Sequence, residues 1–159
     1  MVTLKISGAV KHPVHLSYDN LAAIPEAHQI CDVSRLDPKR RGGAVKLAAL
    51  LTLVEPASNA AWLGLHAKAD DFHASIPLVE VREKAILIYS LEGEPLPSKS
   101  GGPFRFFIPD HKACKTHEID ECANVKFVDH IELTVERGFD NRPHDEAEHE
   151  ALHEKERQG

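Results

Sequence analysis

The sequence predicts an α+β domain built mainly from β-strands, with short helices between them. Several segments alternate apolar and polar residues with a period of two, the pattern of a strand that buries one face. The clearest helical spacing of apolar residues lies at residues 45–54. A chain of 159 residues, with 42% hydrophobic and 28% charged residues, is one ordinary globular domain by size and composition.

The first part of the chain is expected to form two strands and a short helix. Residues 2–10 alternate apolar and polar side chains up to a glycine, so a first strand is predicted there. Residues 14–16 form a second, shorter strand after a turn. Ser17 is a suitable cap for a brief helix over residues 20–23, which must end before Pro25.

The middle of the chain is expected to contain one helix and a series of strands. Residues 45–54 are rich in leucine and alanine at helical spacing, and Pro56 ends that helix. A loop rich in proline, glycine and serine is expected over residues 93–102. The predicted strands cover residues 60–66, 72–78, 85–89, 104–108 and 125–135.

Charge and composition change near residue 138. We expect a domain over residues 1–137 and a polar, acidic, partly helical tail over residues 138–159. Residues 140–159 hold seven acidic residues against three of lysine or arginine, within a net charge of −6. This acidity argues against nucleic acid as a partner, since a nucleic-acid-binding protein presents a basic face.

The sequence predicts neither a membrane span nor a disulfide scaffold. No apolar run approaches the roughly 20 residues that cross a bilayer. The first ten residues lack the basic start and long apolar stretch of a secretory signal, so a cytoplasmic location is expected. Three cysteines in such a chain are expected to be thiols unless they serve a metal or a redox role.

Arg105 is the unusual residue of the predicted strand at residues 104–108. It follows Gly101 and Gly102, which allow the backbone to approach a ligand closely. A guanidinium beside a glycine turn is well placed to hold a phosphate or a carboxylate through paired hydrogen bonds. The alternative is an ordinary edge-strand arginine whose stem lies along the sheet.

Three motifs resemble the oxidoreductase molybdopterin-binding domain of the sulfite oxidase family. Residues 91–97 read LEGEPLP and residues 101–109 read GGPFRFFIP, similar to the central signature of that family. Residues 125–127 (VKF) match its valine–lysine–tryptophan segment, with phenylalanine in place of tryptophan. The opening stretches LKISGAV and LSYDNL are similar too, so the resemblance covers about residues 1–135.

The resemblance implies a molybdopterin cofactor and a role for four kinds of residue. Cys31 would be the thiolate ligand of molybdenum, a soft ligand that suits this metal. Arg105 and Lys126 would hold the pterin or its phosphate, beside Gly101 and Gly102. The implied chemistry is two-electron oxidation or reduction of a small molecule with oxygen-atom transfer, and a separate electron-transfer protein would be the partner. A buried Cys31 in an ordinary core is the alternative for that residue.

A second polar group surrounds His73 and includes His66, Asp70 and Asp71. By the resemblance this stretch lies near the mouth of the active site, where His73 would face an oxyanion or a metal-bound oxygen as a catalytic residue. A histidine near neutrality is able to transfer protons in such a position. The alternative is a loop whose turns are capped by aspartate and histidine side chains.

A third group has the spacing His-x2-Cys-x2-His-x4-Cys. Four nitrogen and sulfur ligands within twelve residues are enough to close tetrahedrally around zinc. Unrelated surface residues and a disulfide are the alternatives. The residues concerned are His111, Cys114, His117 and Cys122.

Three functions therefore compete. The leading one is a molybdopterin-dependent oxidoreductase similar to sulfite oxidase. The second is a binding module that keeps this fold without the metal, favoured by the missing tryptophan after Cys31 and by the short spacing from Pro25 to Cys31. The third is an interaction domain stabilised by zinc.

Overall fold

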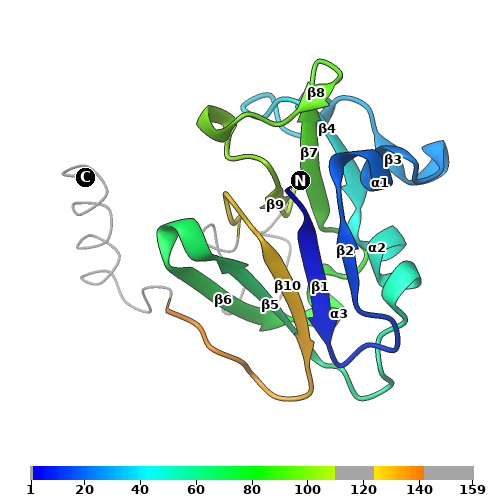
Figure 1. Cartoon of the computed structure of the whole chain (residues 1–159), viewed down its shortest axis with the longest axis vertical. Coiled ribbons are helices and arrows are strands. Elements are labelled where there is room, and N and C mark those ends of the chain that lie inside the picture. Colours follow the sequence, from blue (N-terminus) through cyan, green and yellow to red (C-terminus); the bar gives the residue numbers. More distant parts are fainter. Residues whose placement is uncertain (1, 110–123, 142–159) are drawn as a thin grey trace.

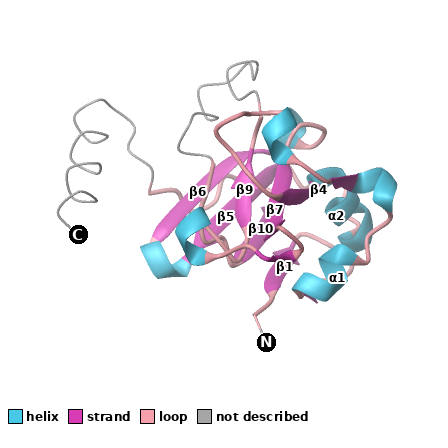
Figure 2. Ribbon diagram, turned by 90° about the horizontal axis from the view of Figure 1, so that it is seen from above, coloured by secondary structure: helices cyan, strands magenta, loops and turns pink. Residues whose placement is uncertain are grey.

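The computed structural model describes residues 2–109 and 124–141, which form two β-sheets joined by short helices (Figures 1 and 2). The mainly β, α+β class predicted from the alternating segments is therefore confirmed. Residues 110–123, which include the four possible zinc ligands, and most of the expected tail lie outside the described residues. The boundary expected near residue 138 stays a prediction.

The first sheet has five strands, and its central strand comes from the last part of the described chain. They are β1 (Leu4–Gly8), β2 (Val14–Leu16), β5 (Trp62–Ala67), β6 (Phe72–Pro77) and β10 (His130–Thr134). Their spatial order is β2-β1-β10-β5-β6, with β1 parallel to β10 and the other pairs antiparallel. Ile131 and Leu133 of β10 are buried, whereas His130, Glu132 and Thr134 alternate with them on the other face.

The second sheet is smaller and antiparallel. It consists of β3 (Gln29–Ile30), β4 (Gly43–Lys46), β7 (Ile86–Leu91), β8 (Glu94–Pro95) and β9 (Arg105–Phe107). The order is β3-β4-β7-β8, and β9 also pairs with β7. Leu87 and Tyr89 of β7 face the main core, while Ile86 and Ile88 face a second apolar cluster. Residues 86–88 of β7 are all apolar because both faces of the strand are covered there.

Three short α-helices connect the strands: α1 (Tyr18–Ala22), α2 (Leu47–Val54) and α3 (Leu78–Val81). The predicted cap at Ser17 is confirmed, because the Ser17 side chain accepts from the Asn20 backbone in a capping box. Helix α2 ends at Val54, and Glu55 takes a left-handed conformation directly before Pro56. No helix within the described ranges is long and apolar enough to cross a bilayer.

The main hydrophobic core joins both sheets to α2. Its apolar residues include Leu63, Leu65 and Ile131 from the first sheet, Val45, Leu87 and Phe106 from the second, and Leu47, Leu50, Leu51 and Val54 from α2. The second cluster covers the opposite face of the second sheet and consists of Val33, Ala44, Ile86, Ile88, Leu96 and Phe107. The second sheet thus has an inner face toward the core and an outer face that is available for a site.

Among the boundaries that differ from the sequence prediction, two affect how the sheets are built. The helix expected from residue 45 begins at Leu47, because residues 43–46 pair with β3 and β7 as strand β4. The strand expected over residues 125–135 begins only at His130. Phe127 has a φ of 58°, which interrupts the extended conformation before that point.

Residues 125–128 instead follow the second sheet. The Phe106 amide donates to the Val125 carbonyl at 2.9 Å, and the Val128 amide donates to the Phe104 carbonyl at 2.9 Å. The chain then enters the first sheet as β10. One continuous segment therefore bonds to both sheets.

Candidate functional site

The outer face of the second sheet carries two neighbouring cavities. The first, which we name the thiol cavity, has a volume of about 620 Å³ and contains Cys31 together with residues 41–43 and 90–93. The second, the cationic cavity, has a volume of about 170 Å³ and is lined by Lys39, Arg40, Arg41, Ile88, Ser100 and Arg105. Arg41 lines both cavities.

Cys31 is an exposed free thiol at the end of β3. It is not a buried core residue, so the alternative of a small packed side chain does not hold. Asp32 follows it and accepts from the Ser34 backbone and hydroxyl. The Ser34 hydroxyl and then the Ser34 amide lower the pKa of the Asp32 carboxyl, because both bonds favour the ionised form.

Gly42 and Gly43 form the wall between Cys31 and β7. Gly42 has a φ of +114°, and a Cβ at this position would lie 2.4 Å from the Ser90 carbonyl oxygen. A Cβ at Gly43 would lie 2.6 Å from the Ser90 hydroxyl oxygen. Any side chain at either position would push the strands apart, so the glycines allow β4 to approach β7 here.

The strand that leads to Cys31 is held by a half-buried side-chain amide. Gln29 donates its side-chain amide to the carbonyls of Leu21 at 2.8 Å and Ile24 at 3.1 Å. It accepts from the Tyr89 hydroxyl at 2.8 Å. These three bonds tie β3 to the end of α1 and to β7, and so fix the backbone two residues before the thiol.

The cationic cavity brings two guanidinium groups together without an acidic partner. The Arg40 guanidinium lies over the Phe107 ring, with its central carbon 5.2 Å from the ring centre. Arg105 donates from Nη1 to the Ser100 carbonyl at 3.3 Å. The Nε atoms of both arginines are buried without a hydrogen-bond partner. Within the described part of the chain, neither guanidinium forms an ion pair with a carboxylate.

The electrostatics of this cavity favour an anion. Burial lowers the pKa of Arg105, and the nearby charge of Arg40 lowers it further. Both causes oppose a charged Arg105 in the protein by itself, and an anion between the two guanidiniums would remove both. Buried polar atoms without partners are uncommon in folded proteins, so two of them at one cavity indicate a missing acceptor.

Gly101, Arg105 and Lys126 meet at one edge of the cationic cavity. Gly101 has a φ of +94°, and a Cβ there would lie 3.0 Å from Cδ of Arg105 and 3.1 Å from Cγ of Lys126. The Phe127 amide donates to the Gly101 carbonyl at 2.8 Å, which holds Lys126 in place next to this turn. The structure therefore brings together three residues that the sequence singled out separately.

Gly102 has a different role. A Cβ at this position would lie 1.9 Å from the Leu96 carbonyl oxygen, so glycine is required by the packing of its own loop. The Gly102 amide donates to the Pro97 carbonyl at 3.0 Å and is engaged within the loop. The binding role predicted for Gly102 from its sequence neighbours stays a prediction.

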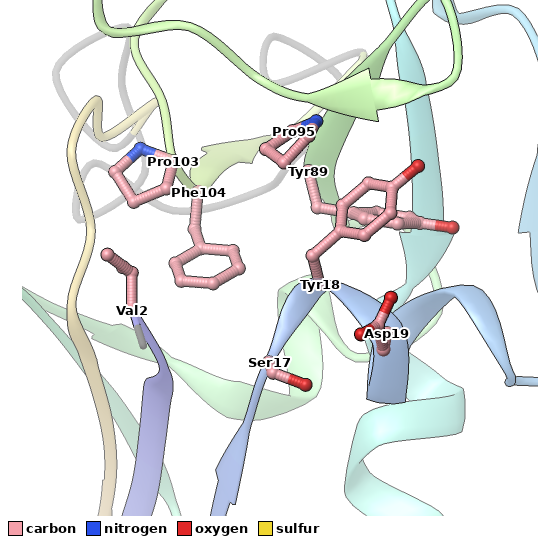
Figure 3. Close-up of a pocket in the computed structure, with 8 residues that line it drawn as sticks. All are labelled: Val2, Ser17, Tyr18, Asp19, Tyr89, Pro95, Pro103 and Phe104. Atoms are coloured by element: carbon pink, nitrogen blue, oxygen red, sulfur yellow. The ribbon is translucent and has the colours of Figure 1, made fainter.

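A third cavity, of about 390 Å³, lies on the other side of the second sheet (Figure 3). Its walls include Tyr18, Tyr89, Pro95, Pro103 and Phe104. Rings of Tyr18 and Tyr89 lie 5.6 Å apart, and the Tyr18 hydroxyl donates to the Gly93 carbonyl at 2.8 Å. Neither a thiol nor a cation lines this cavity, which makes it unsuited to an anionic metal cofactor.

The structure does not bring His73 to the thiol cavity. His73 lies on β6 in the first sheet, where it contacts His66, Asp71, Phe139 and Asn141. None of these residues lines either cavity on the second sheet. The catalytic role predicted for His73 gains no support from its position.

The predicted zinc ligands His111, Cys114, His117 and Cys122 lie outside the described residues. Among residues 2–109 and 124–141, no group of three or more histidine, cysteine or acidic side chains is arranged to hold a metal ion. The zinc hypothesis therefore stays a prediction.

Sequence reasoning missed the contribution of residues 39–41. No role was predicted for this short basic run. The structure places Arg40 over Phe107 and beside Arg105, far along the chain. The available signal was three consecutive cations directly before Gly42 and Gly43, a glycine pair that lets a strand approach closely.

Comparison with known proteins gives a consistent result. Residues 42–141 match the family model described as the oxidoreductase molybdopterin binding domain, a range that includes Gly101, Arg105 and Lys126 and begins after Cys31. A stretch of 113 residues is 29% identical to the uncharacterized oxidoreductase YuiH of Bacillus subtilis (strain 168), covering 67% of this chain and 56% of that protein.

Among solved structures, the chain is similar to the sulfane dehydrogenase SoxCD from Paracoccus pantotrophus. The TM-score is 0.62 at 20% identity, over 86% of this chain and 39% of that chain. At this identity the likeness shows a shared fold. The chain spans a little over half the length of the curated relative.

Proposed function

Because the chain belongs to the oxidoreductase molybdopterin-binding domain family, we propose that it is a molybdopterin-dependent oxidoreductase similar to sulfite oxidase. The observation that carries the proposal is the pair of guanidinium groups of Arg40 and Arg105, each with a buried Nε that has no hydrogen-bond partner in the described part of the chain, next to the cavity that contains the Cys31 thiol. An anionic cofactor whose metal takes one protein thiolate needs this donor set.

The residues present fit such a cofactor. Cys31 would be the protein ligand of molybdenum, since its thiol is exposed and free. Arg40 and Arg105 would hold the anionic phosphate or pterin through their guanidinium groups, whose Nε donors have no partner among the described residues. Lys126 is exposed beside Gly101 and would add a flexible positive charge at the edge of that site. When bound, the cofactor supplies two-electron redox chemistry with oxygen-atom transfer.

The chain's own contribution would be to position the cofactor and to balance its negative charge. Gln29 and Tyr89 fix the strand before Cys31. Gly42 and Gly43 allow β4 to lie close to β7 beside the thiol cavity. A small-molecule substrate would enter at the thiol cavity, which is open where Cys31 is exposed. Two-electron oxidation requires an acceptor for two electrons, and we propose an electron-transfer protein as that partner.

The experiment is to purify the protein from a host that makes the molybdenum cofactor and to measure molybdenum and pterin per chain. We expect near-stoichiometric values for the natural chain. Cys31→Ser should lose molybdenum, and Arg105→Gln and Arg40→Gln should lose pterin as well. Arg35→Gln is the matched control, because Arg35 is exposed and lines neither cavity.

Two outcomes would contradict the proposal. Well-folded natural protein without molybdenum or pterin would favour the alternative of a binding module that keeps the fold but not the chemistry. Molybdenum retained at full level in Cys31→Ser would remove Cys31 from the ligand role.

A further inference from the structure

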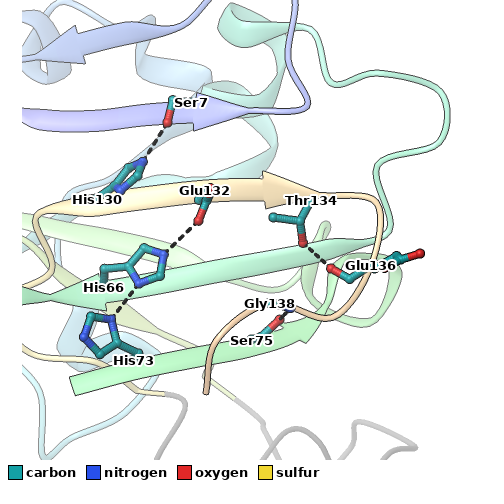
Figure 4. Close-up of polar contacts among 9 residues, drawn as sticks. All are labelled: Ser7, His66, His73, Ser75, His130, Glu132, Thr134, Glu136 and Gly138. Carbon is teal, nitrogen blue, oxygen red and sulfur yellow. Dashed lines mark hydrogen bonds and ion pairs between the residues drawn. The ribbon is translucent and has the colours of Figure 1, made fainter. Parts of the chain in front are cut away.

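Three histidines lie opposite one another on the first sheet, on the face away from the core (Figure 4). His130 of β10 is paired with His66 of β5, and His66 is paired with His73 of β6. Their neighbours Ile131, Leu65 and Ala74 are fully buried in the core. Because side chains alternate along a strand, the three imidazoles share the outer face.

His66 and His73 form a chain of contacts that ends in a carboxylate on each side. The two Nδ1 atoms are 2.8 Å apart. Nε2 of His66 lies 3.1 Å from the Glu132 carboxylate, and Nε2 of His73 lies 3.3 Å from the Asp71 carboxylate. The His66 and His73 side chains are 16% and 22% exposed, so water competes little for the central contact.

We propose that His66 and His73 form one proton-binding site, which carries a single positive charge. An ionised carboxylate only accepts hydrogen bonds, so each Nε2 must carry a hydrogen to satisfy Glu132 and Asp71. The contact between the two Nδ1 atoms requires one further hydrogen. Three hydrogens on two imidazoles are one more than the two neutral rings possess.

Other protonation states fit the contacts less well. A neutral pair has two hydrogens and keeps two of the three contacts. Asp71 is then released, because its side chain is 92% exposed whereas that of Glu132 is 40% exposed. A doubly charged pair would place one N–H against another and break the central contact. Uptake of the first proton therefore strongly opposes uptake of the second.

The remaining charged groups around the pair do not replace this proton. His130 stacks on His66 with ring centres 5.2 Å apart, and burial, followed by the charge of His66, lowers the pKa of His130. His130 therefore favours its neutral form and bonds through Nε2 to the Ser7 hydroxyl. Farther groups that face His130 are Lys5 and Asp129, and next to Ser75 on β6 lie Asp140 and Arg137.

The pair also contacts residues 138–141, which we name the strap. The strap lies along the outer edge of β6: Gly138 donates to the Ser75 hydroxyl, and Asp140 accepts from the Ser75 amide. Asn141 exchanges two bonds with the His73 backbone, at 2.8 Å and 2.9 Å. The strap thus covers backbone groups that an edge strand otherwise leaves open.

The strap contacts both His73 and Asp71, whose contact with each other requires the proton. The Phe139 ring lies 4.8 Å from the His73 ring, and the Asn141 side chain donates to the Asp71 carbonyl at 2.7 Å. Protonation of the histidine pair favours the contact between the Asp71 carboxylate and His73. This contact fixes the turn whose carbonyl accepts the Asn141 hydrogen bond. By linkage, proton uptake tightens the strap, and release of the strap weakens proton binding.

The test is a pH titration of the whole chain, labelled with ¹⁵N, from about pH 5 to 8 by NMR. We expect the two rings to take up one proton between them. The ¹⁵N chemical shift of one Nδ1 should remain that of a nitrogen without a hydrogen. The protection factor of the Asn141 amide, which is its exchange rate relative to the intrinsic rate at the same pH, should rise about tenfold when the pair is charged, the size expected for one charge-assisted hydrogen bond. Asp71→Asn should abolish this dependence. Asp70→Asn, on the same turn, should leave it unchanged.

Three results would overturn the proposal. The first is titration of the rings as two independent histidines. The spectrum of the pair could change on adding a chelator, which would mean that a metal ion occupies the place of the proton. Equal behaviour of the Asp71→Asn and Asp70→Asn variants would also exclude it, because the contact with Asp71 would then need no charge.

Discussion

The guanidinium of Arg40 lies over the ring of Phe107, 5.2 Å from its centre, and faces the same cavity as Arg105. Residue 40 belongs to a loop, whereas residues 105 and 107 belong to β9. The contact fixes one cation above an apolar surface and beside a second cation, with no described carboxylate between them. This arrangement is costly for the protein without a bound anion and predicts how it should respond to one.

We expect inorganic pyrophosphate to raise the melting temperature of the cofactor-free protein. At ten times its Kd, one bound anion stabilises the folded chain by about 1.4 kcal/mol, a shift of several degrees. Arg40→Gln and Arg105→Gln should lose this response. Each should also melt no lower than the natural chain without the anion, since one of two neighbouring cations is gone. Equal responses in these variants and in Arg35→Gln would disprove a role for this cavity.

Gly42→Ala should be far more destabilising than Gly93→Ala. Both glycines have positive φ, +114° and +81°, so both alanine variants carry backbone strain. Only at Gly42 would the new Cβ also meet backbone, 2.4 Å from the Ser90 carbonyl oxygen, whereas Gly93 has open space. We expect the difference in the free energy of unfolding to be about 2 kcal/mol in urea titrations. Similar losses would mean that β4 and β7 separate without cost.

Tyr89→Phe tests the anchor before Cys31. Removal of this hydroxyl leaves the Gln29 side-chain oxygen without its partner and should cost about 1–2 kcal/mol of stability. Cys31 should then react faster with iodoacetamide, because its strand is less firmly held. Tyr18→Phe is the control: it removes a more exposed bond to the Gly93 carbonyl and should change both measurements little. Unchanged Cys31 reactivity in Tyr89→Phe would contradict the positioning role of Gln29.

His130 predicts a loss of global stability in mild acid. Burial, then the charge of His66, lowers its pKa in the folded state below the ordinary value of 6.5. Between the two values the unfolded chain binds more protons, so stability falls as pH decreases from about 6.5 and levels off below the lowered pKa. His130→Gln should reduce this fall between pH 7.5 and 5.5, measured by urea denaturation. His28→Gln, at an exposed position, should not alter it.

All five strands of the first sheet were predictable from local pattern, whereas only β7 and β9 of the second sheet were, and the site was predicted only in part. The signature around Arg105 gave the glycine turn and a strand of alternating side chains, and the structure adds that Lys126 meets that turn. The Arg40–Arg105 pair was not predictable, because more than sixty residues separate the two arginines. No pattern in the sequence around either one indicates that they lie together. Strand β4 was missed because Val45 fits a helical face as well as a strand, and only pairing with β7 decides between them.

The last strand shows the same limit in another form. Residues 125–128 and 130–134 are all apolar enough to read as one strand, but they bond to different sheets. Only the positive φ of Phe127 separates them, and phenylalanine is not a residue type from which a left-handed conformation is predicted.

That divided segment connects the proposed cofactor site to the rest of the chain. Residues 125–128 grip β9 at the cationic cavity, and a few residues later the same backbone becomes the middle strand of the other sheet. Binding at the cavity would therefore also stabilise the segment that continues into the central strand of the first sheet. Resistance to proteases, even at cleavage sites remote from Arg105, should report how many chains in a preparation are filled.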